Sequence, residues 1–406
     1  MYHSILDTDL YKFTTSYAYM KMFPDAECTF KFVDRNRTPR SSEFLVMYKK
    51  KMMELELLYL KNDEFNWAVK NIPFIPMYYW EWLKSFRFEY NKMNIYLDED
   101  NVLCVEVTDK CYKASLYEIP CLYTVNEVNN VELPEIIDGA RKQIDWNETI
   151  SKLNDKITIA NDNDIMFSEF GTRRRFSYEV QDKICAYIKE NSGTCVGTSN
   201  VHFAMKYNMR PCGTHPHEWF MFHGAQFGYK NANYMALENW TNVYDGDLGI
   251  ALTDTFTSNV FFRNFSMKQA KLFDGIRQDS GDEYEFINKA INFYKSKGID
   301  PMSKTIVFSN ALDFHKACNI KYRCEDKIKC SFGIGTNLTC DVYDKLDNGM
   351  IIKYDAENIV MKMSKCRMNE RQPWFNTIKI SDDIGKHMGD SDELKHAYYE
   401  LNIEDK

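Results

Sequence analysis

Short apolar runs and stretches with helical spacing take turns along residues 160–340. The apolar runs lie at 164–167, 194–196, 209–213, 248–252, 273–276, 305–308 and 328–332. Apolar residues spaced three and four apart predict helices at 178–190, 200–207, 217–234 and 284–294. Strands that alternate with helices indicate a parallel sheet, here of roughly seven strand–helix units.

Nearly every predicted strand ends in a polar or glycine-containing motif. Parallel α/β barrels place their chemistry at this end of the sheet, whereas a doubly wound sheet concentrates it at one switch point. We therefore favour a closed or nearly closed α/β barrel and keep the doubly wound sheet as the alternative.

The chain changes character near residue 130, and its 406 residues suit about two domains. Residues 1–130 have a mixed, aromatic-rich pattern, and a strand-like pattern returns at 359–363. We predict a barrel domain over 131–344 and a second domain that joins residues 1–130 to residues 345–406.

Composition narrows the classes of function. A hydrophobic content of 44% allows a large core, and a net charge of -8 argues against a nucleic-acid partner. The twelve cysteines form no Cys-x-x-Cys pair and suit reduced thiols better than disulfides or a zinc ribbon. Neither a signal peptide nor a membrane-spanning run is visible, so we expect a cytoplasmic protein without a membrane partner.

Two strand-end motifs carry groups that suit an anionic substrate. The amides around Gly333, Gly335 and Thr336 can cradle a phosphate, although an ordinary turn explains the same glycines. Arg277 suits an anion, and Asp279 suits Mg²⁺ or sugar hydroxyls.

Three adjacent cations, Arg173, Arg174 and Arg175, directly follow another apolar run. A charge run is usually a solvated face, but this position predicts that at least one arginine faces the rim of the barrel. Spacing does not identify which one.

Four of the eight histidines lie between residues 202 and 223. A zinc motif is the obvious alternative, but His217 and His223 are six residues apart instead of four, and no third ligand is evident. We predict no metal site built from these histidines. His217, at a predicted helix start, is the best placed of them to act as a nucleophile.

Acidic residues precede two predicted helices. Asp282 is expected to cap the helix that follows it, and spacing favours the same interpretation for Asp7, Thr8 and Asp9.

Taken together and in order, the motifs resemble the nicotinate phosphoribosyltransferase family. The resemblance runs nearly end to end and rests on residues 6–12, 23–26, 170–175, 197–201, 213–219, 277–282, 331–336 and 379–381. It implies transfer of ribose 5-phosphate from phosphoribosyl diphosphate to nicotinate, with ATP as co-substrate and Mg²⁺ on the diphosphate, in the salvage of NAD. It also implies an irregular, TIM-like barrel of the type II phosphoribosyltransferases, an α/β sandwich domain built from both chain ends, and a homodimer with shared active sites.

The resemblance assigns roles to single residues. It makes His217 the residue that ATP phosphorylates and gives Asp279 to ribose hydroxyls or Mg²⁺. The remaining positions are substrate contacts: Tyr11, supplied across the dimer interface, Phe170, Arg173, Ser199, Thr214, Arg277, Gly335 and Thr336.

One position bears on the choice of base. Nicotinamide phosphoribosyltransferases, the nearest alternative, carry an aspartate where this chain has Ser199, and a neutral side chain spares the carboxylate of nicotinate from repulsion. Asn310 stands where many relatives have an aspartate, so no carboxylate role is expected there. A sugar-phosphate lyase or aldolase is a weaker alternative, because no predicted strand end carries a Schiff-base lysine.

Overall fold

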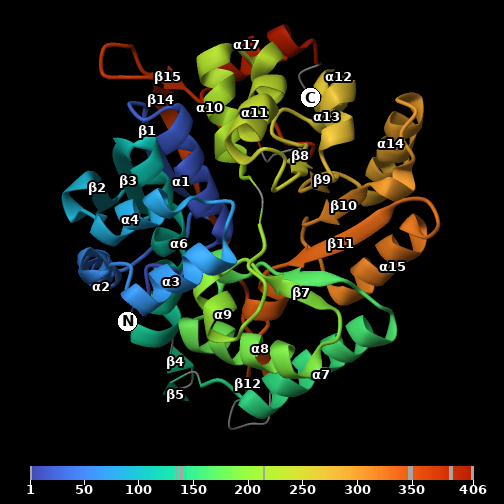
Figure 1. Cartoon of the computed structure of the whole chain (residues 1–406). Coiled ribbons are helices and arrows are strands. Elements are labelled where there is room, and N and C mark those ends of the chain that lie inside the picture. The colour runs from blue at the N-terminus through green and yellow to red at the C-terminus, as the bar shows by residue number, and fades with distance from the viewer. Residues whose placement is uncertain are drawn as a thin grey trace.

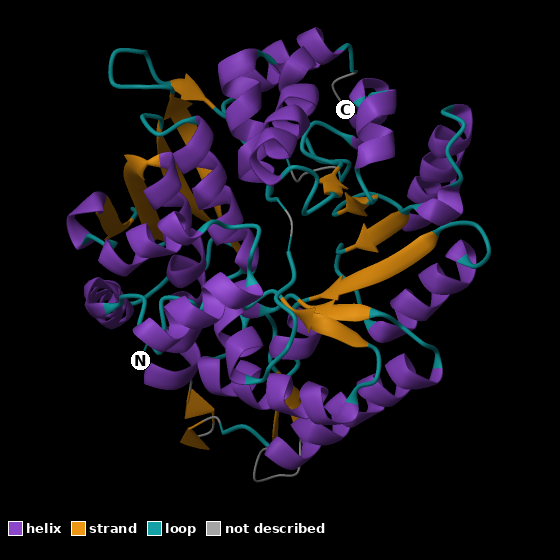
Figure 2. Cartoon of the chain, in the orientation of Figure 1, coloured by secondary structure: helices purple, strands orange, loops and turns teal. Residues whose placement is uncertain are grey.

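The computed structural model describes residues 2–133, 143–213, 215–345, 351–383 and 387–403, together with the backbone of 136–137 and 140–141. Two bodies lie side by side (Figures 1 and 2). One contains a parallel sheet with helices on its outer side, and the other contains an antiparallel sheet covered by helices.

The parallel sheet has six strands in the order β7-β6-β11-β10-β9-β8, and all its pairings are parallel. The strands are β6 (Phe167–Glu169), β7 (Cys195–Thr198), β8 (Ile250–Leu252), β9 (Gly275–Gln278), β10 (Thr305–Phe308) and β11 (Lys329–Ile334). The strand predicted at 209–213 is reduced to one parallel bridge between Thr198 and Pro211. Proline lacks the N–H that a ladder needs, so pairing stops there.

Helices of the barrel body are α7 (Trp146–Asp162), α8 (Tyr178–Asn191), α9 (Val201–Lys206), α10 (His217–Phe227), α11 (Tyr229–Tyr244), α12 (Ser258–Asn264), α13 (Met267–Leu272), α14 (Glu283–Ser296), α15 (Phe314–Cys324) and α16 (Thr336–Thr339). The single helix predicted at 217–234 is wrong in extent. Gly228 adopts a φ of 78°, which ends α10 and lets α11 start in a new direction.

The antiparallel sheet has the order β15-β14-β1-β3-β2 and draws on both ends of the chain. Its strands are β1 (Glu27–Asp34), β2 (Met93–Leu97), β3 (Leu103–Lys110), β14 (Ile359–Arg367) and β15 (Phe375–Asn376). Phe32 of β1 pairs with Met361 of β14, so residues 359–363 join the N-terminal part as predicted. The domain borders stay a prediction.

Apart from single 3-10 and π turns, the remaining described helices are α1 (Leu10–Met22), α2 (Ser42–Glu54), α3 (Asn62–Asn71), α4 (Met77–Ser85), α5 (Cys111–Ala114), α6 (Glu118–Glu127) and α17 (Ser391–Leu401). Short pairs are β4 (Ile136–Ile137) with β5 (Ala140–Arg141) and β12 (Tyr343–Lys345) with β13 (Ile351–Lys353). No helix in the described part of the chain has the length and apolar character needed to cross a bilayer.

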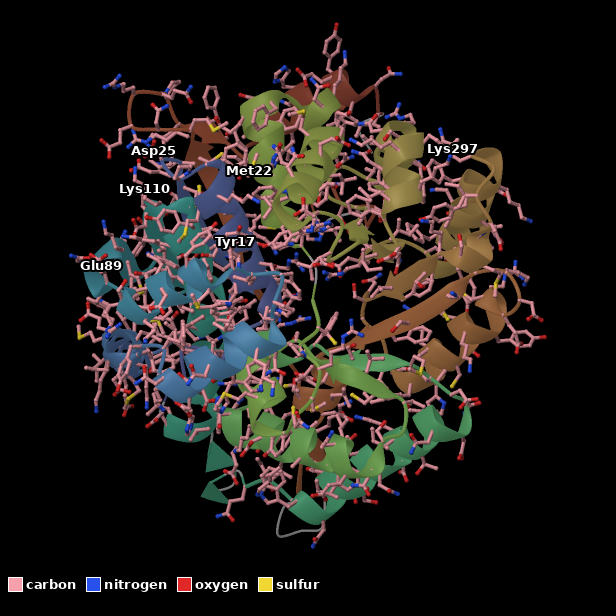
Figure 3. The ribbon with its side chains drawn as sticks, in the orientation of Figure 1. Tyr17, Met22, Asp25, Glu89, Lys110 and Lys297 are labelled. Carbon is pink, nitrogen blue, oxygen red and sulfur yellow. The ribbon has the colours of Figure 1, made fainter. Side chains whose placement is uncertain are left out.

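Helix α1 is buried where the two bodies meet, and its residues from Lys12 to Tyr19 are all buried. Tyr17, which is labelled in Figure 3, packs edge-on against Tyr244 of α11, with ring centroids 5.9 Å apart. The middle of α1 is thereby held beside the barrel.

After β15 the chain returns to the barrel. The amide of Thr257 donates to the carbonyl of Ile380 at 3.0 Å, and the amide of Ile380 donates to the carbonyl of Thr255 at 2.8 Å. This crossing segment, residues 377–383, carries Lys379 to the end of β8.

Candidate active site

His217 is the first residue of α10 and lies at the centre of a polar cluster. Its Nδ1 is 2.9 Å from Thr255 Oγ1, and its Nε2 is 3.1 Å from Asp279 Oδ2 and 3.1 Å from Lys379 Nζ. Only a protonated Nε2 can donate to Asp279, and only an unprotonated Nε2 can accept from Lys379. The two neighbours thus favour opposite tautomers.

The His217 ring is neutral at physiological pH. Burial lowers its pKa to about 4, and the nearby ammonium of Lys379 adds to the effect. A neutral imidazole nitrogen with a free lone pair is a nucleophile.

Arg277 and Asp279 lie at the end of β9 and form one hydrogen-bonded unit with Ser309. Arg277 donates to Asp279 Oδ1 at 2.7 Å and to Ser309 Oγ at 2.9 Å, and Ser309 donates to the same carboxylate oxygen at 2.5 Å. Burial opposes ionisation of Asp279, but Arg277 and His217 outweigh it and hold the pKa of Asp279 well below its ordinary value. Asp282 accepts from the amide of Glu285, which confirms its predicted capping role.

Asp254 follows β8 and completes a set that fits a cation. Its Oδ1 is buried and has no hydrogen-bond partner within the described residues. The ligand atoms of His217, Asp254 and Asp279 all lie within 4.8 Å of one another. An orphaned carboxylate oxygen beside a second carboxylate is an environment that a hard cation satisfies.

Phe170 lies against the glycine loop. Its amide donates to the carbonyl of Ile334 at 2.8 Å, and a Cβ on Gly333 would lie 2.4 Å from the Phe170 ring. A Cβ on Gly335 would lie 3.2 Å from the Phe170 carbonyl oxygen, and Gly335 precedes Thr336, the first residue of α16. The glycines therefore make room for Phe170.

The three adjacent arginines lie in different environments. Arg175 is buried and paired with Asp7. Arg173 and Arg174 are partly exposed, and neither they nor Arg35 form a salt bridge with any described residue. Burial lowers the pKa of Arg174 to about 10, with further lowering by Arg173 and Arg35, which is the signature of an uncompensated cationic cluster.

A fourth cation lies near this cluster. Burial lowers the pKa of Lys362, on β14, to about 8, and Arg173 and Lys379 lower it further. The cations of the N-terminal loop, the barrel rim and the C-terminal strand therefore act on one another.

The interpretation of Asp7 and Asp9 as helix caps is wrong. Asp9 stands at the N-cap of α1 but makes no side-chain cap bond there. Asp9 instead accepts from Ser199 Oγ at 2.6 Å, and Asp7 pairs with Arg175.

Tyr11 is the second residue of α1. Its hydroxyl interacts electrostatically with Arg173 and Arg277 of the same chain. Thr214, another predicted contact, lies outside the described residues. Its neighbour His215, to which the sequence assigned no role, is fully buried between Phe220 and Trp240.

The predicted residues share one edge of the sheet. Strands β7, β6, β11, β10 and β9 are consecutive neighbours, so their carboxyl ends place the predicted Ser199, Phe170, Gly335 and Asp279 in one row with Ser309, which was not predicted. Their meeting at this rim is what the strand-end motifs predicted.

Sequence reasoning missed the roles of Asp254, Thr255, Ser309 and Lys379. Three of these, Asp254, Thr255 and Ser309, lie within three residues of the end of a predicted strand and carry the same positional signal as Arg277. Lys379 lies in the crossing segment, and no local sequence pattern predicts that it reaches the site.

Two family models match the chain. The nicotinate phosphoribosyltransferase (NAPRTase) family matches residues 165–404, and the N-terminal domain of the same family matches residues 6–126. Proteins named nicotinate phosphoribosyltransferase are similar over almost the whole chain. That of Desulforapulum autotrophicum is 38% identical over 398 residues, 98% of either chain. That of Chromohalobacter salexigens is 39% identical over 399 residues, 98% of this chain and 97% of the other.

Solved structures agree with the sequences. The nicotinate phosphoribosyltransferase from Porphyromonas gingivalis matches with a TM-score of 0.93 and 42% identity, over 99% of this chain and 100% of that one. The enzyme of that name from Vibrio cholerae matches with a TM-score of 0.90 and 29% identity, over 100% and 95% of the two chains. These matches confirm the predicted fold class, and the chain is an enzyme that belongs to the nicotinate phosphoribosyltransferase family.

Proposed function

We propose that this enzyme transfers ribose 5-phosphate from phosphoribosyl diphosphate to the ring nitrogen of nicotinate. The products are nicotinate mononucleotide and diphosphate, and ATP hydrolysis to ADP and phosphate is coupled to this first step of NAD salvage from nicotinate. Family membership supports the reaction. The observation that carries it is the contact of His217 with Asp279 and Lys379 at the mouth of the barrel.

His217 accepts the γ-phosphoryl group of ATP in this proposal. With its proton on Nδ1 facing Thr255, the Nε2 lone pair attacks phosphorus, an N–P bond forms, and ADP leaves with the bridging oxygen. Lys379, 3.1 Å from Nε2, is positioned to neutralise the incoming charge. Water later attacks phosphohistidine and restores the free ring.

The base is held between aromatic rings and beside a guanidinium. Phe170 supplies one ring face, and Tyr11, which the family resemblance places across the dimer interface, supplies the other. Arg277 supplies a fixed cation for the carboxylate of nicotinate. Ser199 and Thr214 stay proposed contacts to the same end of the base.

The phosphates of the sugar substrate face the glycine loop and the cationic cluster. Gly335 and Thr336 offer backbone amides to the 5-phosphate. Arg173 and its neighbours Arg35 and Arg174 have no carboxylate of their own within the described chain, so their charge is available to the diphosphate.

Asp254 and Asp279 would hold Mg²⁺, because their oxygens and His217 fit the set of a cation. The ion supplies charge neutralisation for the departing diphosphate. Asp279 meanwhile keeps Arg277 oriented, and the rate enhancement comes mainly from electrostatic placement.

Purified enzyme is expected to convert nicotinate with phosphoribosyl diphosphate and ATP faster than it converts nicotinamide. Liquid chromatography of the two mononucleotides measures both rates side by side. Faster formation of nicotinamide mononucleotide would favour the alternative, a nicotinamide phosphoribosyltransferase. No mononucleotide from either base would contradict the proposal.

The His217 ring is expected to stay neutral at about pH 5.5, because its pKa is lowered to about 4. A histidine with the ordinary pKa would be about 90% protonated there. NMR of ring-labelled histidine, with the His217→Gln variant for assignment, reports the charge directly. A signal that titrates between about pH 7.5 and 6 would contradict the buried, nucleophilic state.

The assembly and location belong to the same proposal. We place the enzyme in the cytoplasm, where its substrates and reducing conditions for twelve free thiols occur. Light scattering that gives the mass of two chains would support the homodimer implied by the family resemblance.

A further inference from the structure

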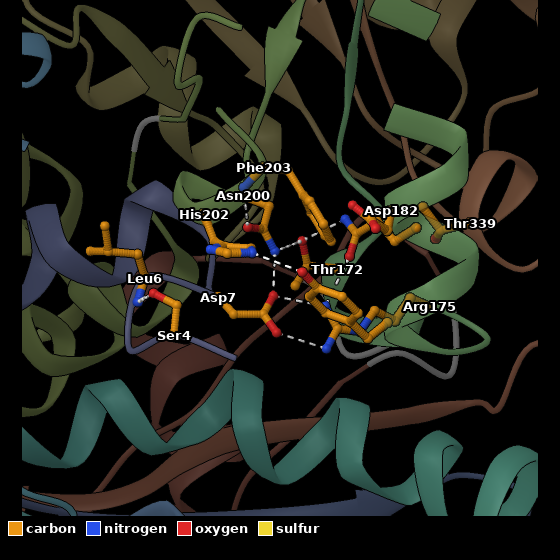
Figure 4. Close-up of polar contacts among 12 residues, drawn as sticks. Ser4, Leu6, Asp7, Thr172, Arg175, Asp182, Asn200, His202, Phe203 and Thr339 are labelled. Carbon is orange, nitrogen blue, oxygen red and sulfur yellow. Dashed lines mark hydrogen bonds and ion pairs between the residues drawn. The ribbon is translucent and has the colours of Figure 1, made fainter. Parts of the chain in front are cut away.

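Three rim segments that are far apart in the sequence meet through one buried ion pair (Figure 4). Arg175 donates to both oxygens of Asp7, at 2.7 and 2.9 Å. The side chains of Arg175 and Asp7 are only 2% and 1% exposed. A two-pronged contact of this kind fixes direction as well as distance.

Asn200 extends the pair to the end of β7. Its Nδ2 donates to Asp7 at 2.8 Å and to Thr172 at 3.2 Å, while its Oδ1 caps α9. The backbones are joined as well, since Leu10 donates to the Ser199 carbonyl at 2.7 Å. The start of α1 and the Ser199 loop therefore move as one unit.

A second branch reaches the end of β6. Arg175 donates to Gln181 at 3.1 Å, and Gln181 donates to Glu169 at 3.1 Å. Glu169 also accepts from Thr198 at 2.6 Å and from the amide of Gly171 at 2.5 Å. The loop between Glu169 and Arg175 is thus held at both of its ends.

Each of these segments carries a proposed contact to a substrate. Tyr11 follows Asp7 by four residues, Phe170 and Arg173 lie between Glu169 and Arg175, and Ser199 precedes Asn200. The members of the network are buried and need not touch the substrate.

Stability alone is a weak reason for the ion pair. Burial opposes ionisation of Asp7, but Arg175 outweighs it and holds the pKa of Asp7 below its ordinary value. Desolvation of two charges offsets most of their attraction, and apolar residues of the same size often stabilise a core equally well. Apolar contacts do not fix the relative orientation of the segments that they join. Loops that bind a flat aromatic base need a fixed orientation.

We propose that the Asp7–Arg175 ion pair is a positioning element, which sets the positions of Phe170 and Ser199 around the base. The inference rests on the proposed function. Asp7, Arg175 and Asn200 act through these neighbours and are not catalytic residues.

Asp7→Asn, which keeps the shape and removes the charge, is expected to raise KM for nicotinate about 10- to 100-fold, the scale of a misplacement of about 1 Å. KM for phosphoribosyl diphosphate should rise much less, because Gly335 and Thr336, the proposed contacts to its 5-phosphate, lie outside the network. Arg175→Lys keeps the positive charge but cannot make the bidentate contact to Asp7, so it should also raise KM for nicotinate.

Arg367→Lys is the matched control. Arg367 also pairs with a partly buried carboxylate, Glu27, but joins β1 to β14 away from the rim. The Arg367→Lys variant should have a lower thermal unfolding midpoint, with KM for nicotinate and KM for phosphoribosyl diphosphate unchanged. If Asp7→Asn does not fold, Asn200→Ser replaces it in the experiment. Serine at this position keeps the cap of α9 and removes the hydrogen bond to Asp7.

The outcomes separate the two hypotheses. A wild-type enzyme that fails to use nicotinate contradicts the proposed function. An active wild type whose variants lose only folded protein, or raise both KM values equally, contradicts the positioning role alone.

Discussion

Replacement of His217 by alanine is expected to abolish transfer of label from γ-labelled ATP to the protein. His217 Nε2 is the only proposed acceptor, and Lys379 lies 3.1 Å from it. Incorporation should fall from about one phosphoryl group per chain to none, as a single nucleophile implies. Stimulation of nicotinate turnover by ATP should disappear with it. Acid-free gel autoradiography detects the label, because phosphohistidine is lost in acid.

His223→Gln serves as the control for this experiment. His223 is buried on the same helix, where it contacts the Trp219 carbonyl at 2.6 Å and Asn239 at 2.9 Å, away from the rim. This variant should keep its label. Label retained by His217→Ala would remove His217 from its role, and absence of label from the wild type would remove ATP coupling from the proposal.

Replacement of Asp279 by asparagine is expected to lower kcat/KM about 10²- to 10³-fold, the usual cost of removing one preorganised electrostatic group. The carboxylate of Asp279 compensates Arg277 at 2.7 Å, and it contacts His217 at 3.1 Å. An amide leaves Arg277 without its ionic partner and removes one proposed Mg²⁺ ligand. Steady-state kinetics at saturating Mg²⁺ measures the loss.

Asp282→Asn is the matched substitution in the same motif. Asp282 is exposed and caps α14, and asparagine is an equally good cap, so activity and stability should both be retained. Equal losses in the two variants would show that the motif matters for folding and not for chemistry.

The strands of the barrel could be predicted where one short apolar run forms one strand. The run at 305–308 coincides with β10, in which Ile306 and Phe308 are buried, because a parallel strand that lies between two others is largely covered on both faces. The failures have local causes that periodicity does not capture. Pro211 limits pairing, and the positive φ of Gly228 divides a helix whose apolar spacing continues through it.

The position of a site residue could be predicted only where it depends on a strand end or helix end next to it in the sequence. Arg277, Asp279 and His217 stand at strand or helix ends, so their meeting followed from the parallel sheet. Asp7 has its partner 168 residues away, and a short acidic segment before a helix has the same sequence whether it caps or forms an ion pair. Long-range partners decide between the two.

The crossing segment has a consequence for synthesis of the chain. A chain that has completed the six barrel strands still lacks Lys379, which follows them in the sequence and lies beside Ile380, whose backbone contacts join this segment to Thr255 and Thr257. Under the proposed function, an unfinished chain would lack the cation that faces the incoming phosphoryl group, and ATP consumption would begin only when translation is nearly complete.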